Sequence, residues 1–171
     1  MPDAPIRHPV KILFLDVDGT MTNGVIGFTH LGDYRSFWVK DGLALEWARD
    51  AGILPVIISG RPSAAVEARM KDLKLEYYLG EKDKVVVAER VIAREGVRWD
   101  ECVMVGDDLP DVPLFNRCGF AAAVPHAPAA VRARAHYVTE RAGGKGAVRE
   151  VCELILASQG LLQPLLAAYG A

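Results

Sequence analysis

Carboxylates recur at short spacing in two segments, each directly after an apolar run. Asp16 and Asp18 stand in DVDGT, and Asp107, Asp108 and Asp111 stand in GDDLPD. For either segment alone, a solvated turn with helix-capping carboxylates is the alternative interpretation. Several carboxylates in one crevice repel one another, however, and a hard divalent cation offsets that repulsion. Because Mg²⁺ prefers oxygen ligands, the pattern predicts a magnesium site if the fold brings the two segments together.

A serine hydroxyl and a lysine stand near the starts of two predicted helices, where they could bind phosphate. Ser59 and Gly60 precede Arg61 just before a predicted helix, whose N-terminus favours anions, although Ser59 could also act only as a cap. Lys84 falls in the first turn of another predicted helix, where a positive charge opposes the helix dipole. A phosphate facing Lys84 explains this placement better than a structural role. The segment GGKG at 143–146 lacks the spacing of a P-loop.

Short apolar runs alternate with helical patterns along the chain. Strands are predicted at 10–17, 53–59, 76–79, 101–105, 120–124 and 136–138, and helices at 42–51, 62–73, 84–95, 111–117, 127–134 and 146–158. This alternation is typical of an α/β fold, a Rossmann-like three-layer α/β/α sandwich with a mostly parallel sheet. Ligands of such sheets bind at the carboxyl ends of the strands, where both acidic segments, Ser59 and Lys84 would meet.

The chain of 171 residues predicts a single domain over 1–171. A β-hairpin insert is expected at about 24–38, with a turn near 30–33. It carries more apolar side chains than a protruding ribbon should expose, so we expect it to pack on another subunit. The tail at about 160–171 is apolar and interrupted by proline, which fits either a frayed end or a partner-binding arm.

Charge and composition favour a cytoplasmic protein without nucleic-acid or membrane partners. The net charge is −2, so no basic excess argues for nucleic acid or an anionic membrane. No apolar run approaches the ~18 residues of a membrane helix, and the N-terminus lacks a secretory core. The three cysteines lack CxxC spacing and are predicted to be free, buried thiols: Cys102, Cys118 and Cys152.

DVDGT, SGR, a lysine before a helix and GDDLPD resemble, in this order, the four motifs of haloacid dehalogenase-type phosphatases. The resemblance implies that Asp16 attacks phosphorus and forms an aspartyl-phosphate. Asp18 then protonates the leaving oxygen and later deprotonates the hydrolytic water, while Lys84 completes the catalytic set. The resemblance further implies three groups of residues: Asp16, the main-chain carbonyl of Asp18 and Asp107 for Mg²⁺; Ser59, Gly60 and Lys84 for the phosphoryl group; Asp108 and Asp111 in support of the metal and Lys84.

DVDGTMTNG, FWVKDG, SGRPS, GDDLPD and AGGKGAVREVCELIL resemble the 3-deoxy-D-manno-octulosonate 8-phosphate phosphatases over roughly residues 10–160. This resemblance implies a capless homotetramer of lipopolysaccharide biosynthesis, in which a neighbouring subunit caps the active site. It implies a small sugar-acid phosphate as substrate, bound by Asp18, Trp38, Val39, Lys40, Asp41, Gly42, Arg61 and Arg69. Arg61 and Arg69 are eight residues apart, so we expect them to share one helix face near the site.

Two residues depart from the family pattern and keep alternatives open. Glu46 stands where many relatives carry a basic residue facing the carboxylate of the sugar acid, and Trp38 replaces a smaller residue. These departures allow a nine-carbon, sialic-type 9-phosphate as substrate, whereas Arg61 favours the eight-carbon acid. A non-enzymatic phosphate-sensing domain is a further alternative. Asp18 argues against it, because a general base beside the nucleophile would release the phosphate.

Overall fold

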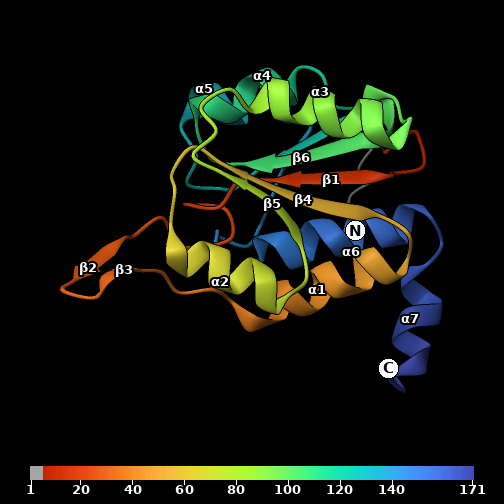
Figure 1. Cartoon of the computed structure of the whole chain (residues 1–171). Coiled ribbons are helices and arrows are strands. Elements are labelled where there is room, and N and C mark those ends of the chain that lie inside the picture. The colour runs from red at the N-terminus through yellow and green to blue at the C-terminus, as the bar shows by residue number, and fades with distance from the viewer. Residues whose placement is uncertain (1–5) are drawn as a thin grey trace.

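A computed structural model describes residues 6–171, in which a six-stranded sheet lies between two layers of helices (Figure 1). The strand order is β5-β4-β1-β6-β7-β8, and all neighbouring pairs run parallel. The strands are β1 (Ile12–Leu15), β4 (Leu54–Ser59), β5 (Glu76–Leu79), β6 (Cys102–Gly106), β7 (Phe120–Ala123) and β8 (Tyr137–Val138). The predicted three-layer α/β fold is thereby confirmed.

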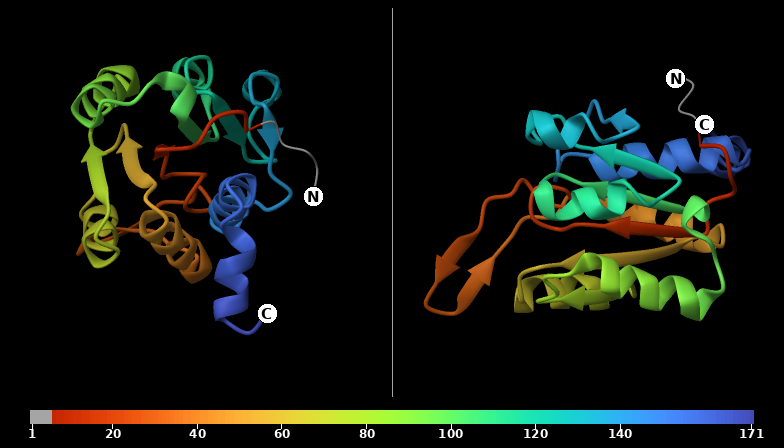
Figure 2. Two further views of the ribbon diagram at one scale, coloured as in Figure 1. Left: turned by 90° about the vertical axis from the view of Figure 1, so that its right-hand side faces the viewer. Right: turned by 90° about the horizontal axis from the view of Figure 1, so that it is seen from above.

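Helices cover both faces of the sheet (Figures 1 and 2). One face is covered by α1 (Val39–Asp50), α2 (Ala64–Asp72) and α6 (Ala147–Ser158), and the other by α3 (Lys84–Glu95), α4 (Val112–Phe115) and α5 (Ala129–Arg132). Central strand β1 serves both cores, since Leu13 and Leu15 pack on the first face and Ile12 and Phe14 on the second. A strand buried on both sides reads as a continuous apolar run, which is why the strands were recognisable in sequence.

Side-chain caps determine where two of the helices begin. The Ser63 hydroxyl accepts a hydrogen bond from the Val66 N–H at 3.2 Å, so α2 begins after Ser63 rather than at residue 62. Arg61 therefore precedes α2, and the prediction that Arg61 and Arg69 share a helix face is wrong. Asp83 caps α3 by accepting from two backbone N–H groups, and the helix predicted at 84–95 is confirmed.

The hairpin and the tail both lie outside the sandwich. Strands β2 (Gly27–Thr29) and β3 (Gly32–Tyr34) form the predicted antiparallel hairpin, which projects from the body (Figure 2). Phe28 and Leu31 at its tip are 77% and 86% exposed. The tail forms α7 (Leu162–Ala168) instead of a frayed end, and the Trp47 indole donates a 3.2 Å hydrogen bond to the Tyr169 hydroxyl.

Neither a disulfide nor a single membrane-spanning helix is found within residues 6–171. Cys102, Cys118 and Cys152 are buried and free, as predicted. No single helix within residues 6–171 is long and apolar enough to cross a membrane, and the pair α6 and α7, which together would be, is bent by 111°.

Candidate active site

The carboxyl ends of adjacent strands open into one cleft of about 630 Å³. Asp16 follows β1, Ser59 ends β4 and Asp107 follows β6, so the parallel pairing of these strands places them together. The cleft is lined by residues of the two acidic segments, the SGR segment and the start of α3: Asp16, Asp18, Ser59, Gly60, Arg61, Lys84, Asp107, Asp108 and Asp111. Both acidic segments and both phosphate-binding candidates therefore meet, as the topology predicted.

Lys84 bridges two carboxylates at the base of the cleft. Its Nζ lies 2.5 Å from Asp16 Oδ1 and 2.6 Å from Asp111 Oδ1, and all three side chains are almost fully buried. Oδ2 of Asp111 accepts hydrogen bonds from the N–H groups of Asp107 and Asp108, at 2.9 and 3.2 Å. Asp111 thus orients Lys84 and the GDDLPD loop together, an arrangement that suits the supporting role predicted for it.

The cleft holds more negative than positive charge. Burial raises the pKa of Asp16 to about 6, with the charge of Asp111 adding to the effect and Lys84 opposing it. Burial also raises the pKa of Asp107 to about 8, reinforced by the charges of Asp16 and Asp111. Burial disfavours the charge of Lys84, but the two carboxylates outweigh it and raise the Lys84 pKa, so the lysine stays protonated.

The donor set fits a hard divalent cation. Carboxylate oxygens of Asp16, Asp107 and Asp111 lie within 4.8 Å of one another. The oxygens of Asp111 already accept from Lys84 and two backbone N–H groups, which leaves Asp16 and Asp107 for a cation. Burial raises the pKa of both remaining carboxyl groups, and a bound cation would offset this cost; carboxylate oxygens are the ligands that Mg²⁺ prefers. Gly19, at φ +97°, has no Cβ that would clash with the Asp107 carboxylate, so the two loops can approach.

The glycine segment at 143–146 supports the nucleophile loop. A Cβ on Gly143 would clash with the Gly19 carbonyl oxygen, and the Gly144 N–H donates to the Thr20 carbonyl at 3.1 Å. The segment therefore packs against the back of DVDGT and does not line the cleft. Sequence reasoning excluded a P-loop here but missed this supporting role, because the signal is only a pair of glycines far along the chain.

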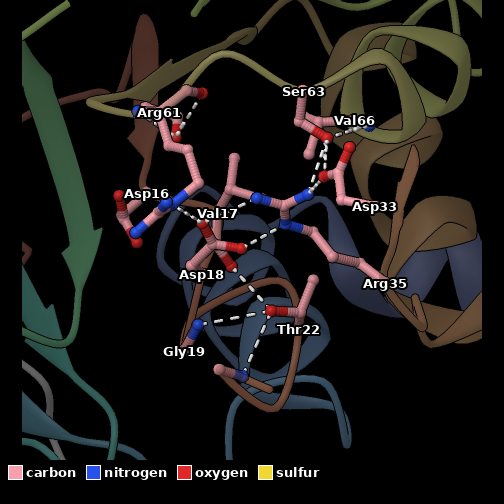
Figure 3. A network of polar contacts seen from close by, with 12 residues as sticks. Asp16, Val17, Asp18, Gly19, Thr22, Asp33, Arg35, Arg61, Ser63 and Val66 are labelled. Atoms are coloured by element: carbon pink, nitrogen blue, oxygen red, sulfur yellow. Dashed lines mark hydrogen bonds and ion pairs between the residues drawn. The ribbon is translucent and has the colours of Figure 1, made fainter. Parts of the chain in front are cut away.

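Arg35 is a second residue that sequence reasoning missed (Figure 3). Its guanidinium Nε lies 2.5 Å from Asp18 Oδ1, and Nη2 lies 3.2 Å from Asp18 Oδ2. Nη1 donates to the Asp33 carboxylate and to the Ser63 hydroxyl, the latter at 2.6 Å. The available signal was only a basic residue between Tyr34 and Ser36 at the base of the hairpin.

The residues predicted to bind the sugar do not gather in one place. Arg61 lines the main cleft, with its Nε 3.9 Å from Asp18 Oδ2. Val39, Lys40 and Arg69 instead line a separate hollow of about 360 Å³ that also includes Glu46. Gly42 lies beside this hollow, since a Cβ there would clash with the Arg69 guanidinium.

Trp38 and Asp41 do not line this hollow, although Lys40 borders both it and the hollow at Trp38. Trp38 lines a third hollow of about 420 Å³ together with Lys40 and Arg149. Asp41 is buried and accepts the Arg149 N–H at 2.9 Å in the first turn of α6, whose own N-cap is Gly146 without a capping side chain. Burial raises the pKa of Asp41 to about 6, although backbone hydrogen bonds oppose the rise. In the single chain, Asp41 therefore serves as a cap of α6 and does not line the main cleft.

This fold and site define a class of phosphoryl-transferring hydrolase. A family model described as haloacid dehalogenase-like hydrolase matches residues 78–151. The 3-deoxy-D-manno-octulosonate 8-phosphate phosphatases of Escherichia coli K12 and Haemophilus influenzae are 37% and 35% identical, over 90% and 88% of this chain and 82% and 85% of their own. A crystal structure of the Moraxella catarrhalis enzyme of that name, in complex with magnesium, phosphate and KDO, superposes with a TM-score of 0.93 at 36% identity and covers 97% of each chain.

The chain therefore belongs to the 3-deoxy-D-manno-octulosonate 8-phosphate phosphatase family of haloacid dehalogenase-like hydrolases.

Proposed function

We propose that this protein is a Mg²⁺-dependent phosphatase that hydrolyses 3-deoxy-D-manno-octulosonate 8-phosphate to 3-deoxy-D-manno-octulosonate and phosphate, in lipopolysaccharide biosynthesis. The observation that carries the proposal is the cleft in which Lys84 joins Asp16 to Asp111 while Asp18 and Asp107 face the same space. Membership of the family supports the choice of substrate. A phosphate-sensing role is disfavoured because Asp18 stands beside the nucleophile.

The proposed reaction proceeds in two steps at Asp16. A carboxylate oxygen of Asp16 attacks phosphorus and the ester P–O bond breaks, while Asp18 gives its proton to the departing oxygen. A water then attacks the aspartyl-phosphate, the Asp16–phosphorus bond breaks, and the ionised Asp18 takes the proton of that water. Two steps through a carboxylate nucleophile leave the enzyme unchanged, with Asp18 protonated again for the next cycle.

The remaining cleft residues bind and orient the phosphoryl group. Ser59, the Gly60 N–H and the Lys84 ammonium would contact its oxygens, since phosphoryl transfer depends mainly on positioning and charge stabilisation. Asp16, the Asp18 carbonyl and Asp107 would hold Mg²⁺, with Asp108 and Asp111 in support. The bound ion would neutralise the charge shared between Asp16 and the phosphate.

The sugar-binding residues and the hairpin lead us to propose a cytoplasmic homotetramer of single-domain chains. One chain leaves the cleft uncovered, and the hollow lined by Val39, Lys40 and Arg69 is separate from it. An exposed hairpin tip with Phe28 and Leu31 is an apolar surface of the kind found at subunit contacts. In the proposed assembly, a neighbouring subunit covers the cleft, and residues 38–42 with Arg69 complete the sugar site.

The test is Mg²⁺-dependent phosphate release from a matched panel of esters. The panel contains 3-deoxy-D-manno-octulosonate 8-phosphate, a nine-carbon keto-acid 9-phosphate, a heptose phosphate and p-nitrophenyl phosphate, each with and without EDTA. We expect at least a hundredfold higher kcat/KM for the eight-carbon acid, or about 2.7 kcal/mol of transition-state binding. A flat profile would contradict the proposed substrate, and activity unaffected by EDTA would contradict the proposed metal.

A further inference from the structure

Arg35 is a buried cation at a point where the chain leaves an exposed ribbon. It follows β3 directly, and its side chain has no solvent-exposed surface, whereas Tyr34 beside it is largely exposed. Burying a charged group is unfavourable unless its donors are paired. Here the guanidinium is paired on both sides, with Asp18 on one and Asp33 and Ser63 on the other.

The partners of Arg35 also bind one another. The Ser63 hydroxyl donates to Asp33 Oδ2 at 2.7 Å and accepts the Val66 N–H in the first turn of α2. The guanidinium is therefore held between the base of the hairpin and the start of α2, as Figure 3 shows. Two elements besides the Asp18 loop therefore hold the guanidinium in place.

The remaining face of the guanidinium determines the orientation of the Asp18 carboxylate. Nε and Nη2 contact the two carboxylate oxygens separately, so rotation of the carboxylate about its terminal bond would break one contact. Such two-point ion pairs are both stronger and more directional than single hydrogen bonds. Arg61 cannot replace this function, because its side chain is 60% exposed and its Nε is 3.9 Å from Asp18.

We infer that Arg35 is a positioning residue of the proposed phosphatase reaction, which holds the ionised Asp18 carboxylate in the orientation that accepts a proton from the hydrolytic water. The inference rests on the proposed function. After the first step Asp18 has given its proton to the leaving oxygen and carries a negative charge, which faces Arg35. In the second step the water oxygen bonds to phosphorus, the Asp16–phosphorus bond breaks, and Asp18 takes the proton. Arg35 itself exchanges no proton.

The proposed role of Arg35 concerns only the second step, and p-nitrophenyl phosphate allows the two steps to be measured separately. Its phenolate leaves without needing a proton, so formation of the aspartyl-phosphate does not depend on Asp18. Hydrolysis of the aspartyl-phosphate, by contrast, depends on Asp18 as the base that takes the proton of water. For Arg35→Gln we expect a burst of about one p-nitrophenolate per site and a kcat about 10- to 100-fold lower, with kcat/KM changed less than about threefold. The KM falls with kcat because the phosphorylated enzyme accumulates.

Two further variants complete the experiment. Arg35→Lys keeps the charge but offers a single point of contact, so we expect a smaller fall in kcat, again with little change in kcat/KM. This variant decides the question if Arg35→Gln does not fold. Arg94→Gln is the matched control. It removes an arginine that pairs with Glu76 and Glu95 and does not line the cleft, and it should show neither burst nor change in kcat.

Equal losses of kcat and kcat/KM without a burst in both Arg35 variants would overturn the role of Arg35 while leaving the proposed function intact. A wild-type protein that hydrolysed none of the esters with Mg²⁺ present would overturn the proposed function, and the role of Arg35 with it.

Discussion

Removing one carboxylate from the active site should make the metal-free protein more stable. We predict this for Asp107→Asn, because Asp107 sits beside Asp16 and Asp111 and its ionised form is disfavoured by burial and by both neighbours. Asparagine has a similar shape and carries no charge. The same substitution should abolish Mg²⁺ binding, since it removes one of the two carboxylates left free for a cation.

The size of the effect follows from the pKa of Asp107. A rise from 3.8 to about 8 corresponds to at most about 6 kcal/mol at about 1.4 kcal/mol for each unit of pKa. Asp107 is only half-buried and solvent screens part of this repulsion, so we expect about 2 kcal/mol at pH 7.5. For a chain of this length, that gain raises the Tm by about 4–8 °C.

The gain should depend on pH with a definite sign. Between pH 4 and about 8 the folded wild-type protein holds a proton on Asp107, and up to about pH 6 also one on Asp16, that the unfolded chain has released. The free energy of unfolding of the metal-free protein therefore falls as the pH rises through this window. At pH 5 the advantage of Asp107→Asn should shrink to about one third of its value at pH 7.5. The cost of burying Asp107 accumulates only above the pKa of the unfolded carboxyl, 3.8, and pH 5 lies little above that value.

The assay is thermal or urea unfolding in EDTA and in excess MgCl₂, at pH 5 and pH 7.5. Wild type should gain about 2.7 kcal/mol at a Mg²⁺ concentration a hundredfold above its Kd, and Asp107→Asn should gain none. Asp108→Asn is the matched control, because asparagine can keep the cap that Asp108 forms with the Leu109 N–H and the charge of Asp108 contributes least to the raised pKa of Asp107, so its stability should rise far less. An Asp107→Asn protein less stable than wild type in EDTA at pH 7.5 would refute the reasoning.

Three further predictions follow from the same structure. Asp16→Asn should lower phosphate release at least about 10⁴-fold while circular dichroism stays unchanged, because the nucleophile is lost but not the fold; measurable phosphorylation of that variant would contradict the covalent mechanism. Replacing both Phe28 and Leu31 by glutamate should give a smaller species in light scattering, and an unchanged mass would exclude the hairpin tip as a subunit contact. Asp83→Ala should lower the free energy of unfolding by about 1 kcal/mol through loss of the α3 cap, with a further fall in kcat if Lys84 moves with the helix; a variant of wild-type stability would show that the cap contributes nothing.

The residues of the cleft could be predicted from sequence because topology alone brings them together. Asp16, Ser59 and Asp107 each stand at the end of a strand, and parallel neighbours end at the same edge. Lys84 could be recognised because a cation in the first turn of a helix has an electrostatic cost that needs a reason. No side-chain contact had to be known in advance for either inference.

Residues whose partners are distant in sequence could not be predicted in this way. Arg35 reaches Asp18 only because the hairpin turns back on the body, and Asp41 accepts from Arg149 across two packed helices. The start of α2 was misplaced for a more local reason. Ser63 lies in extended conformation as the N-cap, and periodicity does not reveal which of several polar residues takes that position.

The contact between Gly143–Gly144 and the DVDGT loop sets the order in which a newly made chain can become active. All the residues that line the cleft have been synthesised once Asp111 is added, yet the loop that carries Asp16 rests on backbone made later, after the last strand of the sheet. A nascent chain that ends before Gly143 has every cleft residue and lacks the support behind its nucleophile. We therefore expect catalytic competence to require synthesis of the chain at least through Gly144, which follows the last strand of the sheet.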